Sequence, residues 1–240
     1  MTNFIEPPEA FPYEPPTVQV RERYSRLFEL TNPPNIRPCK RAFDVLMSSF
    51  FIVLTSPLLL LLYLMNFLEG LIDKSARGPL IFYYKSVSRG KVIKKWKVRS
   101  IKHTHIKSKI FEHDDWRAYA GEWDDDQKTF TGKFAKKFYL DELPQFYSIL
   151  WGDMSFVGPR PLAVHHYERD LEQGNITRKF LLGGLLGFGH IRKGTEEFGK
   201  SEWEYEYLEQ YLEQSCVSLI LLDLWVIYRG FKVVLEGKGL

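Results

Sequence analysis

The segment that decides the fold is VLMSSFFIVLTSPLLLLLYLMNFL, residues 45–68. Its 24 consecutive residues carry no charged side chain, and one helix of that length is long enough to cross the ~30 Å hydrocarbon core of a bilayer. A helix of a soluble protein rarely stays uncharged on every face over such a distance. The segment therefore predicts a membrane-embedded helix rather than the core helix of a soluble domain.

A bend is expected at Ser56-Pro57, in the middle of this segment. Proline lacks a backbone N–H, so the carbonyl of Val53 loses its helical partner, and Ser56 is pushed away from helical geometry. The hydroxyl of Thr55 or of Ser56 is placed to satisfy that carbonyl.

Two membrane arrangements follow, a kinked helix that crosses the bilayer and a re-entrant hairpin that turns at Ser56-Pro57 and leaves on the same side. Each limb has about 12 residues and would be roughly 18 Å long, shorter than the ~30 Å core. Positive residues mark the cytoplasmic side of a membrane. Both flanks are basic, with Arg37, Lys40 and Arg41 before the segment and Lys74, Arg77 and Lys85 after it. The charges favour the re-entrant hairpin.

The rest of the chain predicts an α+β fold that is mainly helical. A small strand pair is expected at 81–84 and 92–98, with its turn at 88–91. Periodic apolar residues predict a helix at 141–151, and helices are also expected at 161–173 and 195–214. A further helix is expected at 217–235, where burial in the domain and an interfacial position on the membrane are equally compatible with the pattern.

These elements divide the chain into three parts. Residues 1–36 are rich in proline and predict an extended tail with a short helix near 20–30. Residues 37–72 form the membrane hairpin, and residues 73–240 form a compact cytosolic domain with amphipathic interfacial helices.

Charge and cysteine content limit the partners and the compartment. The net charge is only +3, but residues 85–109 hold ten Lys and Arg and no acid. This run either faces anionic lipid or forms a solvated positive face, and its aromatic residues are too sparse for nucleic-acid binding. Two cysteines, Cys39 and Cys216, are too few for a disulfide scaffold and are not spaced as metal ligands, so a reducing compartment is the simplest interpretation. The first residues do not form a secretory signal peptide.

Adjacent carboxylates, Asp141 and Glu142, form the candidate catalytic pair at the expected start of helix 141–151. Free N–H groups, the helix dipole and Lys136 upstream would keep Asp141 ionised. An ionised carboxylate can act as a nucleophile, a metal ligand or a general base. Mg²⁺ would bridge such a carboxylate to a substrate phosphate. The turn Gly158-Pro159-Arg160-Pro161 fixes Arg160, whose guanidinium suits bidentate phosphate binding.

Together these motifs resemble the bacterial sugar transferases, the monotopic phosphoglycosyl transferases that start lipid-linked glycan assembly. The stretch LDELPQ at 140–145, followed by GDMS at 152–155 and VGPRP at 157–161, is similar to the central motif of that family. KRAFD at 40–44, and GP at 78–79 followed by KVRS at 97–100, resemble its other two blocks. The resemblance extends from about residue 37 to 240.

The resemblance implies an enzyme that moves a sugar 1-phosphate from a UDP-sugar to undecaprenyl phosphate and releases UMP. It implies that Asp141 attacks the phosphate, that Glu142 deprotonates the acceptor, and that Mg²⁺ at Asp141 assists. Phosphate contacts are implied for Lys136, Lys97 and Arg99 as well as Arg160.

The implied location is the cytoplasmic face of the bacterial inner membrane, with lipids as partners and no nucleic acid. A homodimer, or contacts with glycan-assembly proteins, remain open. GGLLGFGH at 183–190 departs from the PGITGLAQ block of the family and keeps two of its glycines. That departure leaves room for an unusual sugar, and it supports the rival interpretation of a non-catalytic membrane scaffold.

Overall fold

The computed structural model describes residues 11–108 and 124–235 of the chain. It forms two compact units. Unit 1 is the described part of Met1–Lys40, Val87–Lys91 and Ser155–Leu240, and unit 2 is the described part of Arg41–Ser86 and Val92–Met154. The fold is mixed α/β and mostly helical, as the sequence predicts.

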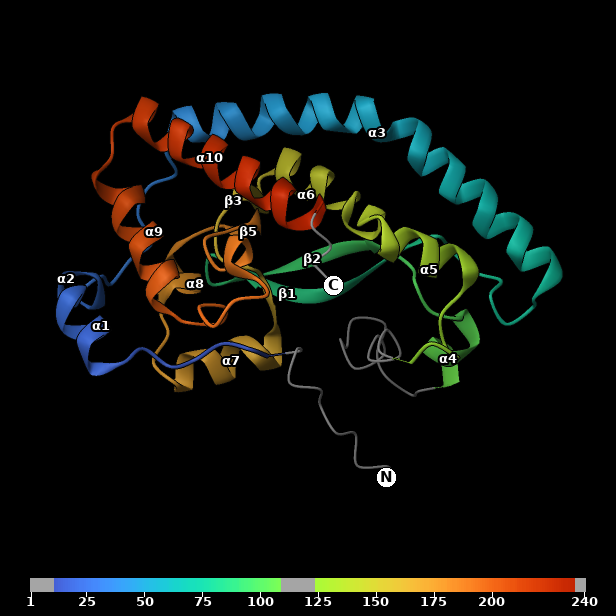
Figure 1. Ribbon diagram of the computed structural model, residues 1–240, viewed down its shortest axis with the longest axis horizontal. Helices are drawn as coiled ribbons and strands as arrows, with labels where there is room; N and C mark the ends of the chain where they lie inside the picture. The colour runs from blue at the N-terminus through green and yellow to red at the C-terminus, as the bar shows by residue number, and fades with distance from the viewer. Residues whose placement is uncertain (1–10, 109–123, 236–240) are drawn as a thin grey trace. The chain divides into compact units, whose positions relative to one another are not determined.

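The apolar segment forms α3 (Pro38–Ile72), a helix of 35 residues that contains Pro57. Figure 1 shows that α3 changes direction along its length. The Ser56 hydroxyl donates to the carbonyl of Val53 at 2.9 Å, which confirms that a side chain satisfies the group left by Pro57. Because the helix continues through the proline, two limbs folded back on each other are not confirmed.

Most of the surface of α3 is apolar and exposed. Within the described residues, α3 is the one helix long and apolar enough to cross a membrane, and only 11% of its most hydrophobic window is buried inside the protein. The core helix of a soluble domain would be largely buried. The exposure of α3 therefore differs from that of a buried core helix, and α3 is a candidate membrane helix.

In unit 2, α3 packs on a β-hairpin and on α5 (Phe130–Lys137). The hairpin consists of β1 (Ile81–Ser88) and β2 (Lys91–Val98), with a two-residue turn in which Arg89 and Gly90 have φ values of 51° and 69°. Such left-handed turns match the twist of paired strands. Leu62, Leu80, Val98 and Ala135 form the buried cluster between these elements. The strand pair was predicted, but β1 is longer than expected. Helix α4 (His103–Ser108) follows the hairpin.

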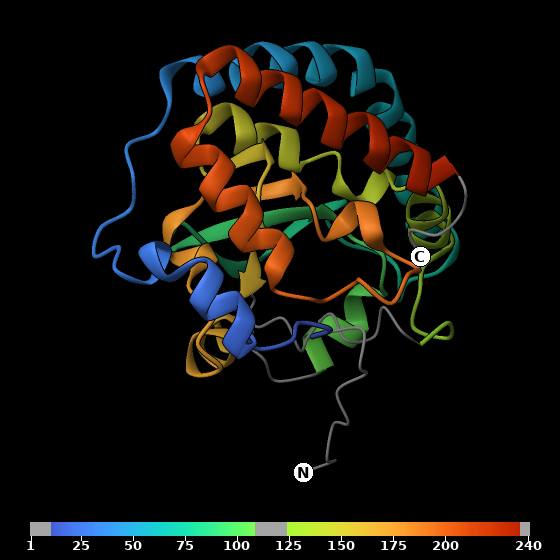
Figure 2. The ribbon, with the colours of Figure 1, turned by 60° about the vertical axis from the view of Figure 1, so that its left-hand side comes forward.

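Unit 1 contains most of the remaining elements, which we list in chain order: α1 (Val18–Arg23), α2 (Ser25–Phe28), β4 (Leu162–Ala163), α7 (Val164–Glu172), α8 (Thr177–Phe180), β5 (Gly183–Leu186), η4 (His190–Arg192), α9 (Glu202–Glu213) and α10 (Cys216–Leu235). The strand orders are β2-β1-β4 in one sheet and β3-β5 in the other, where β3 is Met154–Val157. Figure 2 shows α9 and α10 meeting at a sharp corner.

Helix α10 confirms the helix predicted at 217–235 and has two different faces. Leu219, Asp223 and Val226 are fully buried in unit 1, whereas Val217 and Tyr228 are exposed. Part of the predicted basic run is also internal, because Lys95, Lys97 and Arg99 are buried and so cannot face lipid. Lys109, the last residue of that run, lies outside the described residues.

The proline-rich N-terminal region is more ordered than the expected extended tail. It forms α1 and α2 instead of one short helix, and it buries Phe11, Val20, Tyr24 and Leu27. Prolines prevent long helices but not packing, so buried aromatic and aliphatic side chains anchor this segment to unit 1. Residues 1–10 of the predicted tail lie outside the described residues.

The cysteine count indicated a reducing compartment, but in the structure Cys39 and Cys216 form a disulfide across a sequence separation of 177 residues. The first turn of α3 and the first turn of α10 meet within unit 1. Next to this bond, Lys40 Nζ donates to Asp223 Oδ2 at 2.5 Å, and both side chains are buried. Two cysteines so far apart in sequence show no spacing that would reveal their proximity.

Candidate functional site

The acid pair lies in a short 3₁₀ turn rather than in the first turn of an α-helix. This turn, η3 (Leu140–Glu142), follows Tyr139, whose φ is 57°, and precedes α6 (Gln145–Trp151). The prediction of one helix over 141–151 was therefore wrong at its start, because the backbone bonds of Leu143 to Leu140 and of Phe146 to Leu143 span three residues, and Pro144, the N-cap of α6, has no N–H to donate. Its end was right, since Gly152 terminates α6 with a φ of 94°.

Contacts at the start of α5 fix the position of this turn. The carboxylate of Glu69, on α3, accepts from the backbone N–H of Phe130 at 2.6 Å and of Thr131 at 2.9 Å. A Cβ on Gly132 would lie 2.1 Å from the carbonyl oxygen of Ser100, so only glycine permits this approach. Helix α5 is thereby held against α3 and the end of the hairpin, and η3 begins three residues beyond it.

The centre of the site is an ion pair between Lys97 and Asp141. Lys97 Nζ, from β2, lies 3.1 Å from Asp141 Oδ2, and the two side chains are only 7% and 6% exposed. A cation at this distance favours the ionised carboxylate, and burial strengthens the attraction. The sequence predicted a role for each residue separately, and the structure brings them together.

Three further side chains come from the same stretch of chain as Asp141, residues 136–142. Glu142 lies beside Asp141 in η3, Lys136 lies in the last turn of α5, and both are partly buried. Burial raises the pKa of Tyr139, and the carboxylates of Asp141 and Glu142 raise it further. This tyrosine is therefore a neutral phenol at pH 7. Its hydroxyl is buried and has no hydrogen-bond partner among the described residues.

Arg41 was missed as a residue that positions α6. Its Nη1 and Nη2 donate to the carbonyls of Ile149 and Leu150, both at 2.6 Å. Those carbonyls belong to the last turn of α6, where backbone acceptors lack the i+4 donors of a continuing helix and positive charge is favourable. The only sequence signal was the place of Arg41 in the KRAFD block.

Arg99 has a structural task in this fold. Its guanidinium is buried and donates to the carbonyls of Pro79 (2.8 Å), Ile101 (2.6 Å) and Ala76 (2.7 Å), and to Asn66 Oδ1 (2.7 Å). Burial lowers the pKa of Arg99, but a guanidinium stays protonated at any ordinary pH. The side chain thus ties the end of β2 to α3 and to the Gly-Pro segment, and its donors are already engaged by protein acceptors.

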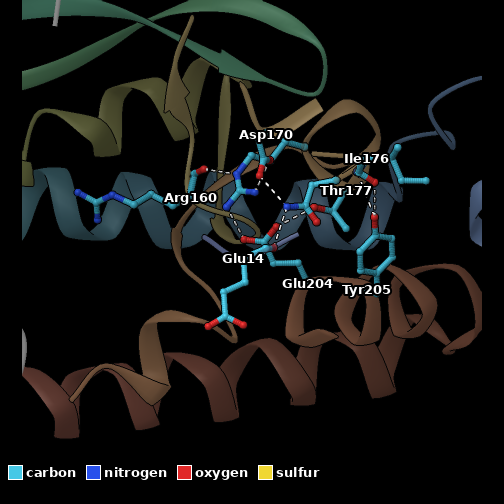
Figure 3. Close-up of polar contacts among 10 residues, drawn as sticks. Glu14, Arg160, Asp170, Ile176, Thr177, Glu204 and Tyr205 are labelled. Carbon is cyan, nitrogen blue, oxygen red and sulfur yellow. Dashed lines mark hydrogen bonds and ion pairs between the residues drawn. The ribbon is translucent and has the colours of Figure 1, made fainter. Parts of the chain in front are cut away.

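Arg160 belongs to unit 1, in the turn between β3 and β4. Its Nη1 lies 3.3 Å from His190 Nε2, and its carbonyl accepts from Nε of the buried Arg178 at 3.0 Å. Figure 3 shows that the Arg160 carbonyl faces a cluster of polar side chains, while its own side chain extends away from it. The cluster was missed in the sequence because its charged members are scattered among α7, α8 and α9.

Mg²⁺ is the metal implied by the resemblance, with Asp141 as its predicted ligand. The described parts of the chain contain no group of three His, Cys, Asp or Glu side chains that could hold a metal by themselves. However, Mg²⁺ usually takes one or two carboxylates and completes its shell with water and substrate phosphate. A single buried carboxylate such as that of Asp141, which also pairs with Lys97, fits that second mode.

The fold and the site define a small α/β protein with a membrane-type apolar helix and a buried carboxylate–lysine pair. The family model described as "Bacterial sugar transferase" matches residues 36–237, so the chain belongs to the bacterial sugar transferase family.

Three relatives illustrate the similarity. Over 199 residues the chain is 35% identical to a UDP-glucose:undecaprenyl-phosphate glucose-1-phosphate transferase of Klebsiella pneumoniae, covering 80% of this chain and 40% of the relative. It is 32% identical over 226 residues to a protein of the same name from Escherichia coli (strain K12), and the match covers 87% of this chain and 46% of that relative. It is 28% identical over 213 residues to the exopolysaccharide production protein ExoY of Sinorhizobium fredii, covering 83% and 87%. The chain thus spans less than half the length of the first two relatives.

Proposed function

We propose that the protein transfers a sugar 1-phosphate from a UDP-sugar to undecaprenyl phosphate and releases UMP. The observation that carries this proposal is the buried ion pair of Lys97 and Asp141. Both residues lie in the part of the chain that the family model matches, residues 36–237. The names of the relatives from Klebsiella pneumoniae and Escherichia coli state this reaction with glucose as the sugar. We leave the sugar of this chain unassigned.

In the first step, a carboxylate oxygen of Asp141 attacks the phosphorus that bears the sugar. A bond forms from that oxygen to phosphorus, and the bond from phosphorus to the bridging oxygen breaks, so UMP leaves with the electron pair. In the second step, a phosphate oxygen of undecaprenyl phosphate attacks the same phosphorus and Asp141 leaves as a carboxylate. Glu142 would take the proton from the acceptor if it arrives protonated.

Lys97 makes this attack electrostatically feasible. A carboxylate and a diphosphate repel each other, and in a site with little water that repulsion is large. The ammonium group 3.1 Å from Asp141 provides the opposing charge, first to the carboxylate and then to the phosphate oxygens. Lys136 and Arg160 remain proposed phosphate ligands. Mg²⁺, bound by Asp141 together with substrate phosphate, would supply further charge neutralisation.

We also propose that α3 enters the cytoplasmic leaflet and returns to the same face, bending at Ser56-Pro57. The exposed apolar surface of α3 and the basic residues at both of its flanks support this arrangement. The exposed face of α10, with Leu221, Trp225, Tyr228 and Phe231, would lie at the membrane interface, where aromatic side chains are favoured.

The test is UMP release from a panel of UDP-sugars in the presence of undecaprenyl phosphate and Mg²⁺. We expect turnover with one or a few donors and its loss in Asp141→Asn. The control is Asp125→Asn, which changes an exposed carboxylate of the same unit and should keep full activity. Mass spectrometry should find a phosphosugar on Asp141 when the acceptor is omitted. Full turnover by Asp141→Asn would contradict the mechanism, and a folded protein silent across the panel would favour the scaffold.

A further inference from the structure

Arg178 is the centre of a buried charge cluster in unit 1. Figure 3 labels its two carboxylate partners, Asp170 and Glu204. Its Nη1 pairs with Asp170 at 2.7 Å and its Nη2 pairs with Glu204 at 2.5 Å. Its Nε donates to the carbonyl of Arg160 at 3.0 Å. Burial would lower the pKa of Arg178, but the two carboxylates outweigh burial and raise it, so the guanidinium is permanently charged.

The backbone around Arg160 is held on both sides as well. Gly158 N–H donates to the carbonyl of Leu186 at 2.9 Å, and Gly184 N–H donates to the carbonyl of Pro159 at 2.8 Å. A Cβ on Gly158 would lie 2.3 Å from the carbonyl oxygen of Leu182, so this approach requires glycine. Arg178 therefore adds a third restraint to the turn, applied directly to the residue whose side chain extends toward His190.

The N-terminal segment, residues 11–17, covers the cluster. The ring of Tyr13 lies over the Arg178 guanidinium, with 4.2 Å between its centroid and the guanidinium carbon. The carbonyl of Glu14 accepts from Asn175 Nδ2 at 3.1 Å, and the same nitrogen donates to Asp170 Oδ1 at 2.8 Å. Glu14 N–H donates to the carbonyl of Gly199 at 2.9 Å. This segment precedes residue 36, where the match to the family model begins.

We propose that residues 11–17 form a positioning segment, in which Tyr13 holds Arg178 in place and Arg178 in turn orients Arg160. The proposal rests on the phosphate-binding role that the proposed function gives to Arg160. Tyr13 is a positioning residue, because it touches neither substrate nor the reacting atoms.

The geometry explains why an aromatic ring suits this place. A guanidinium forms its hydrogen bonds in its own plane, so a ring stacked on its face leaves every in-plane N–H available. The ring also keeps water from that face, which strengthens the bonds to Asp170, Glu204 and the Arg160 carbonyl. Without the ring, water would compete for the guanidinium and the turn would become more mobile.

The first measurement is hydrogen–deuterium exchange of the full-length protein in detergent, which needs no activity. In Tyr13→Ala, we expect faster exchange of the amides of Gly158 and Gly184, with the amides of α3 and α5 unchanged. Tyr13→Leu keeps an apolar side chain of similar size but removes the aromatic face, so it should show the same faster exchange. It also replaces Tyr13→Ala in the measurement if the alanine variant does not fold. Tyr13→Phe should restore slow exchange. Glu14→Ala is the matched control, because that side chain points away from the cluster (Figure 3).

The second measurement is steady-state kinetics with the donor found in the panel. We expect the KM for the UDP-sugar to rise by about five- to tenfold in Tyr13→Ala, in line with a buried cation–π contact, while kcat changes less than about twofold. Tyr13→Phe should recover the wild-type KM.

The two measurements separate the possible failures. Unchanged exchange at Gly158 and Gly184 in both Tyr13→Ala and Tyr13→Leu would overturn the positioning role. Faster exchange with an unchanged KM would overturn the link to donor binding. A wild-type protein that releases no UMP from any donor would overturn the proposed function, and the exchange data would still decide whether Tyr13 positions the turn.

Discussion

At the scale of the residue, Lys97 and Asp141 form a buried ion pair in unit 2. Both side chains are almost entirely buried, so neither charge can be compensated by water if the other is removed. Breaking a buried ion pair by removing one partner typically costs about 3–5 kcal/mol, because the remaining charge is left uncompensated. In the proposed reaction, which brings negative charges together, the same desolvation would strengthen the attraction of Lys97 for the phosphate.

We predict that Lys97→Met lowers kcat by at least about 100-fold and lowers the free energy of unfolding by about 3–5 kcal/mol. The double variant Lys97→Met with Asp141→Asn should regain much of that stability but none of the activity, since the unpaired carboxylate is gone. Urea unfolding and UMP release measure the two effects.

Lys91→Met provides the control for this series, because Lys91 is an exposed residue of the same strand. Lys91→Met should leave both kcat and the free energy of unfolding unchanged. A Lys97→Met protein with wild-type stability would show that Asp141 is not charged in the folded state.

At the scale of the element, the course of α3 depends on Pro57. The proline cannot donate to Val53, and the Ser56 hydroxyl takes over that acceptor at 2.9 Å. Thr55 Oγ1 donates to the carbonyl of Phe51 at 2.7 Å, one turn earlier. Hydroxyls that bond to backbone carbonyls bend helices, and here two of them act together with a proline. Bending thus has a local cause that does not depend on the lipid.

We predict that Pro57→Leu turns α3 from a re-entrant helix into one that spans the bilayer. Leucine restores the N–H donor and removes the ring clash, so a straight apolar helix becomes long enough to cross the ~30 Å core. The measurement is labelling of introduced thiols on either side of α3, Asn32→Cys and Lys74→Cys, in a background without Cys39 and Cys216.

In the parent with Pro57, a membrane-impermeant reagent added from the cytoplasmic side should label both thiols. With Pro57→Leu, one of the two should become accessible only from the opposite side. Leu58→Val, a change that keeps the proline, is the control. Opposite-side labelling in the parent itself would rule out the re-entrant arrangement.

At the scale of the whole molecule, Cys39 and Cys216 connect segments that are 177 residues apart in the chain. A cross-link that closes so long a loop restricts the unfolded state strongly, and the chain-entropy model gives about 5 kcal/mol of stabilisation. The bond lies beside the buried pair of Lys40 and Asp223, within unit 1. Covalent and electrostatic contacts therefore reinforce the same junction of α3 and α10.

We predict that Cys39→Ser lowers the free energy of unfolding by about 5 kcal/mol in oxidising buffer and has little effect in reducing buffer. Cys216→Ser and the double variant should give the same loss, because all three remove one bond. Equal unfolding midpoints for wild type in the two buffers would contradict a stabilising disulfide.

Local rules explain which parts were predicted correctly from the sequence. The strand pair, the apolar helix at 217–235 and the hydroxyl bond near Pro57 depend on residues within a few positions of one another. The start of the helix after Asp141 was missed because the apolar periodicity begins before α6 does. The chain first forms the 3₁₀ turn η3, and α6 starts only after Pro144. A 3₁₀ turn and the first turn of an α-helix share similar apolar spacing, so periodicity does not distinguish them.

The sequence by itself determined the long apolar helix with a proline in its middle, the adjacent acids of the central motif, and membership of a family that those motifs define. Hydrophobicity and backbone hydrogen bonding act over short stretches, so they can be read from consecutive residues. Only the tertiary structure decided that Lys97 meets Asp141, that Arg99 binds carbonyl groups, that Cys39 reaches Cys216, and that Tyr13 covers Arg178. Each of these pairings depends on how separate elements pack, and a charged, thiol or aromatic group does not encode in its own chemistry which distant partner it will meet.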